Sequence, residues 1–309
     1  MKKIIIIRSS GNELANQLWN YASIYAYSLE KKYSIVNSSF FEYGEYFNFK
    51  SAPNLLFRIM FFRPFRNYTK RKTAIKRRVW RKMYSWYSMI VLFLNKKNTV
   101  TTANEVCYLP PTKQPDFKLK MLENSNDDIY LDGWLFRNPI GLEKFRKEIK
   151  KTFIPRKDVR ITVESTIGKI RSDYNKIVGL HIRQGDYMTW RNGDYFIEQK
   201  RVREIIDEFI SNFNIDKNKT CFLIASDGPI DKEIFFDLNI FISKNNAVTD
   251  LYLLSCTDAI IGSNSTFGAF ASYYGNVPLI VMQKDPMDWQ YYSGRQKYFE
   301  NKYSTFVQY

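Results

Sequence analysis

The sequence has little of the chemistry on which many enzymes depend. Its 309 residues contain one histidine, and the three cysteines, Cys107, Cys221 and Cys256, are far apart and form no C-x-x-C pair. This spacing argues against a zinc site and a disulfide framework, and it fits a reducing compartment. The sequence also has no D-x-D pair, no Walker-type loop and no G-x-G-x-x-G turn. We therefore expect no bound metal, no P-loop and no dinucleotide fingerprint.

Long apolar runs are missing as well. Four isoleucines, Ile4 to Ile7, follow the first lysines and end at Arg8. Such a run is too short for a signal-peptide core or a membrane span, so we expect a buried strand in a cytoplasmic protein. The chain is nevertheless 45% hydrophobic, which supports a real core in one large domain or in two of about 150 residues.

Acidic residues are absent between Glu45 and Glu105, although the chain carries a net charge of +16. The segment Arg58 to Lys97 holds thirteen lysines and arginines. Its later part predicts a helix with an apolar stripe and a cationic opposite face. Three interpretations compete: a membrane-surface patch, a nucleic-acid patch, and a solvated helix packed on the protein. The first is favoured because tryptophan and basic residues together suit a lipid interface. The stripe consists of Ile75, Val79, Met83, Trp86, Ile90 and Leu94.

Short apolar runs followed by polar turns recur along the chain. Such runs are typical of parallel strands covered on both faces, and helical periodicity lies between many of them. We predict an α/β protein made of two α/β units in tandem. The expected strands are Lys3 to Arg8, Ser34 to Val36, "IYLDGW", "KIVGLHIR", "TCFLIAS", "DAIIGS" and "VPLIVM", and the expected helices include one carrying Leu14 to Leu29, "IGLEKFRKEIKKTFIP" and Val159 to Ile170.

Polar residues follow several of these strands, at the sheet edge where α/β proteins bind ligands. Arg183 ends a buried strand, and its guanidinium fork suits two phosphate oxygens, but a structural pair with Asp186 explains it equally well. The lone His181 is more simply a core residue than a catalyst. The loop Ser263 to Thr266 offers donors at a predicted helix N-terminus, which fits either an anion site or an ordinary N-cap.

Taken in order, these loops resemble glycosyltransferase family 11, the α-1,2-fucosyltransferases. The matching stretches are "SGNELANQLWNYASIYAYSLEKKY", "HIRQGDY", "LIASDGP" and "DLYLLSCTDAIIGSNSTFGAFASYYG". The segment "LDGWLFRNPIGLEKFRKEIKKTF" is similar to the family's aromatic strand and following helix. The resemblance covers nearly the whole chain except the basic region of residues 50 to 115.

The resemblance implies a GT-B-type fold of two Rossmann-like lobes with a GDP-sugar donor between them. We expect an acceptor-side lobe at 1–172, with the basic insertion near 55–98, and a donor-binding lobe at 173–309 whose last helix packs back on the first lobe. It also implies inversion at the anomeric carbon without a metal or other cofactor.

By position in the motifs, the resemblance assigns catalysis to Arg183, which would stabilise the leaving diphosphate, and to Asp186, the nearest candidate for a general base. Asn16 and Gln17 would face the cleft from the first lobe. The donor-binding residues would be His181, Asp227, Asn264, Ser265, Thr266 and Phe267.

Three departures from the family pattern stand out. Gln184 replaces a second arginine, the opening loop is less glycine-rich, and "STFGAFASYY" lacks paired tryptophans.

We predict transfer of L-fucose from GDP-fucose to a hydroxyl of a glycan, in α-1,2 linkage, during surface polysaccharide or O-antigen synthesis. The acceptor would be lipid-linked or another glycan, at the cytoplasmic face of an anionic membrane and without nucleic acid. The alternatives are a transferase using another nucleotide sugar and a non-catalytic basic protein that binds a membrane or nucleic acid.

Overall fold

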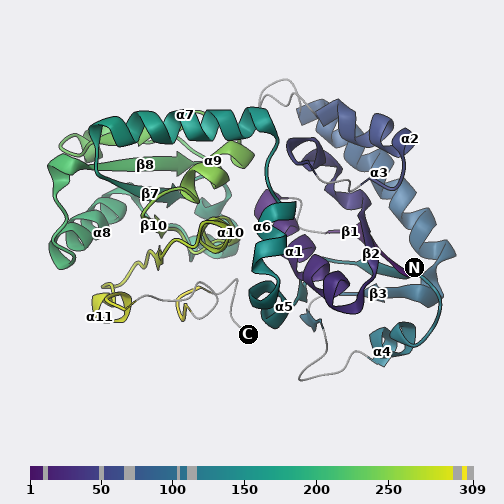
Figure 1. The fold of residues 1–309 in the computed structure, drawn as a ribbon. Coiled ribbons are helices and arrows are strands. Elements are labelled where there is room, and N and C mark those ends of the chain that lie inside the picture. Colours follow the sequence, from purple (N-terminus) through teal and green to yellow (C-terminus); the bar gives the residue numbers. More distant parts are fainter. Residues whose placement is uncertain are drawn as a thin grey trace. The chain divides into compact units, whose positions relative to one another are not determined.

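The computed structural model describes residues 1–9, 13–48, 52–65, 74–102, 105–109, 117–294 and 301–304. Two compact units divide the chain, Met1–Lys157 and Asp158–Tyr309 (Figure 1). The sequence predicted the boundary between the two lobes at 172/173. The boundary between the two compact units falls earlier, because helix α7 (Lys157–Asp173) packs with the second unit. Arg171 of α7 forms an ion pair of 2.7 Å with Asp258 of that unit.

The first unit is built on a four-stranded parallel sheet in the order β2-β1-β5-β3, accompanied by a two-stranded sheet, β4-β6. One of its two inner strands is the isoleucine run of the N-terminus, in which Ile4, Ile6 and Ile7 are fully buried. The elements are β1 (Lys3–Arg8), α1 (Leu14–Lys31), β2 (Ser34–Asn37), α2 (Leu55–Phe57), α3 (Ala74–Leu94), β3 (Thr99–Thr101), β4 (Cys107–Tyr108), α4 (Phe117–Glu123), β5 (Ile129–Asp132), β6 (Phe136–Arg137), α5 (Pro139–Lys144) and α6 (Arg146–Thr152).

The second unit is a five-stranded parallel sheet in the order β11-β10-β7-β8-β9. Strand β7 is buried on both faces after its first residue, which explains its unbroken apolar sequence. Helices α7 to α10 accompany the sheet (Figure 1). The elements after α7 are β7 (Lys176–Ile182), α8 (Gln199–Asn212), β8 (Thr220–Ser226), β9 (Ile240–Ile242), α9 (Ala247–Leu254), β10 (Ala259–Gly262), α10 (Thr266–Gly275), β11 (Leu279–Val281) and α11 (Trp289–Tyr292).

One expectation about elements was wrong, and some strands were not expected. The predicted single helix before Pro155 is two helices, α5 and α6, which separate at Phe145. Hydrogen bonds run almost continuously across this break, from Phe145 N to Gly141 O and from Ile149 N to Phe145 O, so the periodicity concealed it. Strands β3 and β9 were missed because each has only three residues and lies at the edge of its sheet.

Helix α3 shows how the basic segment folds. The sequence predicted its apolar stripe and left open whether that stripe packs on the protein. From Val79 onward every residue of the stripe is exposed, whereas Tyr84 and Ser88 on the opposite side are buried. The helix packs on the protein through this opposite side, and the apolar stripe itself is left exposed. Ile75 has no described side chain.

Candidate active site

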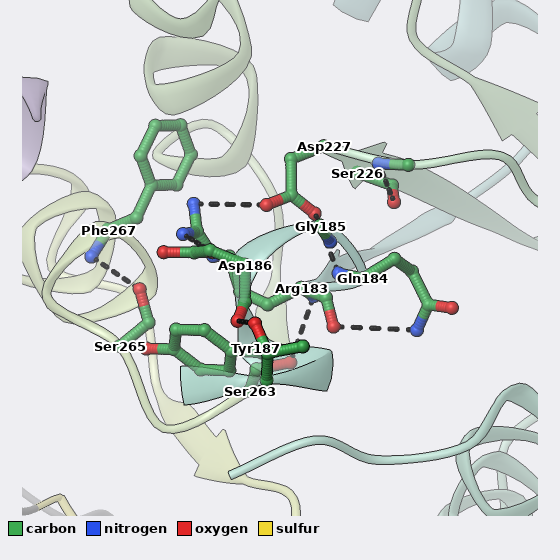
Figure 2. A network of polar contacts seen from close by, with 12 residues as sticks. Arg183, Gln184, Gly185, Asp186, Tyr187, Ser226, Asp227, Ser263, Ser265 and Phe267 are labelled. Carbon is green, nitrogen blue, oxygen red and sulfur yellow. Dashed lines mark hydrogen bonds and ion pairs between the residues drawn. The ribbon is translucent and has the colours of Figure 1, made fainter. Parts of the chain in front are cut away.

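The direction in which the chain adds strands to the second sheet reverses between β7 and β10. The chain proceeds from β7 to β8 and β9 on one side, and then returns to place β10 on the other side of β7. In open α/β sheets, the carboxyl ends of the strands at such a switch point form the usual ligand site. Here the loops after β7, β8 and β10 converge at this edge, as the network in Figure 2 shows.

Arg183 lies at the centre of this network, directly after β7. Its guanidinium forms ion pairs with Asp186 and with Asp227, the latter at 3.3 Å, and it lies over the Tyr187 ring at 4.9 Å. Its backbone N–H donates to Ser263 Oγ at 3.1 Å. The Arg183 Nε is buried and has no hydrogen-bond partner within the described ranges. The arginine is therefore held in place and still has a donor to offer.

Asp227 follows β8 and orders the loop that carries Arg183. Its Oδ1 accepts hydrogen bonds from the backbone N–H groups of Gln184 at 2.6 Å and Gly185 at 3.1 Å. Burial raises the pKa of this carboxyl, but the Gln184 hydrogen bond, the Arg183 charge and the Gly185 hydrogen bond together bring the pKa below its ordinary value. Asp227 is thus an anion at neutral pH, and it positions Arg183 and its backbone at once.

Gln184, which stands where the family pattern has an arginine, is 9% exposed. Its side-chain amide lies 3.4 Å from the Ile197 carbonyl oxygen, and its Oε1 accepts from Gln199 at 3.2 Å. Gln199 also donates to the Pro229 carbonyl oxygen at 3.1 Å. Gln184 is therefore linked through Gln199 to the loop after β8, and position 184 contributes hydrogen bonds instead of a charge.

His181, the residue before the last in β7, is 4% exposed, and its ring stacks on Phe267 at 4.8 Å between centroids. Burial, followed by the charge of Arg183, lowers the pKa of His181 to about 3. The imidazole is therefore neutral at physiological pH and is unsuited to act as a cation there. Its Nδ1 is buried without a hydrogen-bond partner in the part of the chain that the structure describes.

The loop after β10 places small polar residues beside Arg183. Ser265 caps helix α10 by accepting a hydrogen bond from Phe267 N at 3.1 Å. Ser263 and Thr266 are nearly buried, and the Asn264 carbonyl oxygen accepts from the Tyr187 hydroxyl at 2.9 Å. The positive end of the α10 dipole and the Arg183 guanidinium thus favour an anion at the same edge.

The structure brings together most of the residues predicted from the sequence. Arg183, Asp186 and five of the six predicted donor-binding residues belong to the three converging loops and the first turn of α10, and the sixth, His181, lies near the end of β7. Asn16 and Gln17 lie on α1 of the first unit, where Gln17 is 3% exposed, and their cleft-facing role stays a prediction. No group of three His, Cys, Asp or Glu side chains within the described residues is placed to hold a metal ion.

The sequence interpretation overlooked two contributors to the site. Tyr187 supports Arg183 with its ring, and burial raises the pKa of its hydroxyl to about 12. Its presence in the quoted "HIRQGDY" segment was the available signal. Gly228 was the other omission: a Cβ there would lie 2.6 Å from the Gln184 Cβ. No sequence pattern reveals that close approach.

Comparison with known proteins places this arrangement among the glycosyltransferases. The family model described as Glycosyl transferase family 11 matches residues 139–304, which include every residue of the network. No curated protein sequence matches the chain.

Several solved structures share the fold. A mutant of Arabidopsis thaliana FUT1 in complex with GDP is 14% identical, with a TM-score of 0.54 over 92% of this chain and 71% of that chain. The fucosyltransferase NodZ from Bradyrhizobium is 15% identical, with a TM-score of 0.50 over 93% and 97%. POFUT1 in complex with GDP-fucose is 12% identical, with a TM-score of 0.50 over 91% and 97%. The predicted GT-B-type fold is confirmed.

Proposed function

The chain belongs to glycosyl transferase family 11, and from this premise we propose that it is an inverting transferase that moves L-fucose from GDP-fucose to a glycan hydroxyl. The neighbours solved with GDP and with GDP-fucose support the choice of donor. The family motifs quoted from the sequence support an α-1,2 linkage and an acceptor in surface polysaccharide or O-antigen.

One observation carries the proposal: the anchored but incompletely satisfied guanidinium of Arg183. It stands at the switch point of the sheet, beside the N-terminus of α10, with its Nε lacking a partner among the described residues. A planar fork of this kind matches the oxygens of a diphosphate. Asp227 and Asp186 hold the side chain while 20% of it remains exposed, so a ligand oxygen can approach the guanidinium.

The proposed reaction needs negative charge to be stabilised on the departing GDP. The bond between the fucose anomeric carbon and the diphosphate oxygen breaks, and its electron pair remains on that oxygen. Arg183 and the α10 N-terminus stabilise this developing charge, as a divalent ion does in other transferases, so we propose that transfer needs no metal. The acceptor oxygen bonds to the anomeric carbon from the opposite face, which inverts its configuration.

The acceptor hydroxyl must lose its proton as the new bond forms. Asp186 is the proposed base because its carboxylate is 61% exposed and so is open to an acceptor while remaining beside Arg183. His181 is proposed instead as a neutral hydrogen-bonding residue of the donor site. Its Nδ1 faces the first turn of α10, because a Cβ at Gly268 would lie 3.5 Å from that atom.

Nucleotide titration followed by a transfer assay tests the proposal. We expect calorimetry to show that GDP binds at least about tenfold more tightly than UDP or CDP, since the base is what distinguishes them. GDP-fucose should then be consumed in the presence of a glycan acceptor and excess EDTA, and NMR of the product should show the α-1,2 linkage. Equal affinity for the three nucleotides would remove the GDP-sugar assignment. Tighter binding of UDP or CDP would instead favour the related transferase with another donor.

A further inference from the structure

Helix α3 of the first unit exposes an unusually large apolar surface. Seven of its apolar side chains are between 43% and 79% exposed, and they recur at helical spacing on one side. An apolar patch of this extent on a folded protein marks an interaction site more often than chance exposure. We call this surface the α3 apolar face; it consists of Val79, Met83, Trp86, Met89, Ile90, Phe93 and Leu94.

The face points outward because the opposite side of α3 is bound to the first unit. Tyr84 is 6% exposed and donates a hydrogen bond to the Ile7 carbonyl oxygen of β1. Arg77 and Arg81 both bind the buried carboxylate of Glu42. Arg77 and Arg81, which the sequence placed opposite the stripe, therefore hold the helix on the protein. Because this side of α3 is packed, the apolar side faces away from the first unit.

A second apolar segment adjoins the face. The Phe57 and Phe61 rings of the preceding segment pack against Tyr84 and Tyr87 of α3, and Trp80 Nε1 donates to the Met60 carbonyl oxygen at 2.9 Å. This packing fixes the segment along α3. Its own outer side chains are also exposed, by 45% to 74%, and they are Leu55, Leu56, Ile59 and Met60.

Positive charge lies at both ends of this apolar surface. Arg78 and Lys82 are exposed in the N-terminal half of α3, and Lys96 and Lys97 are exposed just beyond its C-terminal end. No acidic residue lies between Glu45 and Glu105 in the sequence. Glu42 and Glu45 are themselves only 6% and 5% exposed, so they add little negative charge to the outer surface.

The combination of an apolar centre and a cationic rim selects among partners. A second copy of the chain would bring the same positive rim against itself, which opposes pairing. Nucleic acid would satisfy the cations but would leave the aliphatic side chains without an apolar environment. An anionic bilayer offers both, because acyl chains bury the apolar residues while lipid phosphates attract the lysines and arginines.

We propose that the first unit docks on an anionic lipid bilayer through the α3 apolar face, with α3 lying in the interface parallel to the membrane. The exposed side chains of the face run from Val79 to Leu94, which corresponds to about 23 Å of helix along the surface. None of the helices in the described ranges is long and apolar enough to cross a membrane. The hydrogen bond and ion pairs of Tyr84, Arg77 and Arg81 fix how the unit is presented to the lipid.

Vesicle flotation tests the proposal with the full chain. The wild type should float with vesicles of phosphatidylcholine and phosphatidylglycerol, and bind phosphatidylcholine alone more weakly. The variant Ile90→Ser/Phe93→Ser should lose at least about tenfold in partitioning, because two exposed apolar anchors no longer enter the bilayer. Arg78→Gln/Lys82→Gln should lose about tenfold or more on the anionic vesicles only.

Matched variants in the second unit serve as controls. Ile161 and Phe236 are 53% and 80% exposed, close to the 58% and 79% of Ile90 and Phe93, so Ile161→Ser/Phe236→Ser makes an equivalent change elsewhere. Arg160→Gln/Lys169→Gln removes two exposed charges from α7 in the same way. Both control variants should bind vesicles like the wild type. GDP affinity and thermal midpoint should be unchanged in all four variants, which separates this proposal from the proposed function.

Three results would overturn the proposal. One is absence of wild-type binding to the anionic vesicles, and another is equal binding by Ile90→Ser/Phe93→Ser. The third is a dimer in analytical ultracentrifugation that only the α3 variant dissociates, without change in vesicle binding, since the face would then join two copies of the chain.

Discussion

The two units carry the same constellation at corresponding places in their sheets. In the first unit Arg8 ends β1 and pairs with Asp132, which ends the neighbouring strand β5 and precedes a glycine. In the second, Arg183 follows β7 and pairs with Asp227, which follows the neighbouring strand β8 and also precedes a glycine. Identical residue types at equivalent strand ends therefore let the details of each pair be compared directly.

The two arginines differ in how many of their guanidinium nitrogens have a partner. Arg8 donates from Nε and Nη2 to the two carboxylate oxygens of Asp132, at 2.7 and 2.6 Å, in a bidentate pair. Arg183 divides its terminal nitrogens between two carboxylates, and its Nε has no partner within the described ranges. The first arrangement closes a structural pair, whereas the second keeps an anchored cation available for a ligand.

The sharpest test of this contrast exchanges each arginine for alanine. Arg183→Ala should lower kcat/KM for transfer by about 10²- to 10³-fold, because the leaving diphosphate loses its main charge stabilisation. Arg8→Ala should leave kcat/KM within a few-fold and lower the free energy of unfolding by about 1–2 kcal/mol, because the buried Asp132 carboxylate loses its partner. Transfer kinetics and urea unfolding measure the two effects.

Lysine variants control for charge alone. Arg183→Lys keeps a cation but not the fork, so it should recover only part of the lost rate. Similar kinetic losses for Arg8→Ala and Arg183→Ala would refute the division of roles between the two units.

The glycines that follow the two aspartates extend the comparison. Gly133 has φ +127°, and a Cβ there would lie 2.5 Å from the Thr102 carbonyl oxygen, so the backbone itself forbids a side chain. Gly133→Ala should therefore lower the free energy of unfolding by about 2–4 kcal/mol and leave the GDP affinity of the folded protein unchanged.

Gly228 has no positive φ, and its added Cβ would meet the side chain of Gln184. Gly228→Ala should cost about 1–2 kcal/mol in stability and weaken GDP binding about tenfold, because Gln184 and the adjoining Arg183 loop must move. Urea unfolding and calorimetry give both quantities for each variant. If the ratio of lost stability to lost GDP affinity is the same for both glycine variants, the loop after β8 that carries Gly228 does not contribute specifically to GDP binding.

These comparisons also show which features the sequence could predict. Short apolar runs marked all six strands of four or more residues in the two sheets, and also β11, but they missed the three-residue edge strands β3 and β9. The ordered motifs marked the loops that meet in the site. Asp227 as the partner of Arg183 was not readable from residue spacing, because the two meet only when β7 and β8 are neighbours. Periodicity likewise showed that α3 has an apolar stripe, but a period does not say which side of a helix is packed. The exposure of Trp86 became visible only with Tyr84 and Glu42 in place.

A further contrast lies two residues before each arginine, where the first unit has the fully buried Ile6 and the second has His181. Burial, followed by the Arg183 charge, holds the pKa of His181 at about 3, against 6.5 for an ordinary imidazole. Between these values the unfolded chain binds a proton that the folded chain excludes. The free energy of unfolding therefore falls as the pH drops below 6.5, by up to about 1.4 kcal/mol per pH unit, until the folded imidazole titrates.

The variant His181→Gln isolates this contribution, because glutamine keeps a polar side chain without a titration. Between pH 7 and pH 5 the wild type should lose about 2 kcal/mol more stability than the variant in urea unfolding. Above pH 7 the two stability profiles should run parallel, since the imidazole is then neutral in both folded and unfolded chains. Parallel profiles down to pH 5 would mean that His181 also binds the proton in the folded protein. The second unit would then accommodate a charged imidazole, contrary to the neutral role that we propose for His181 in the donor site.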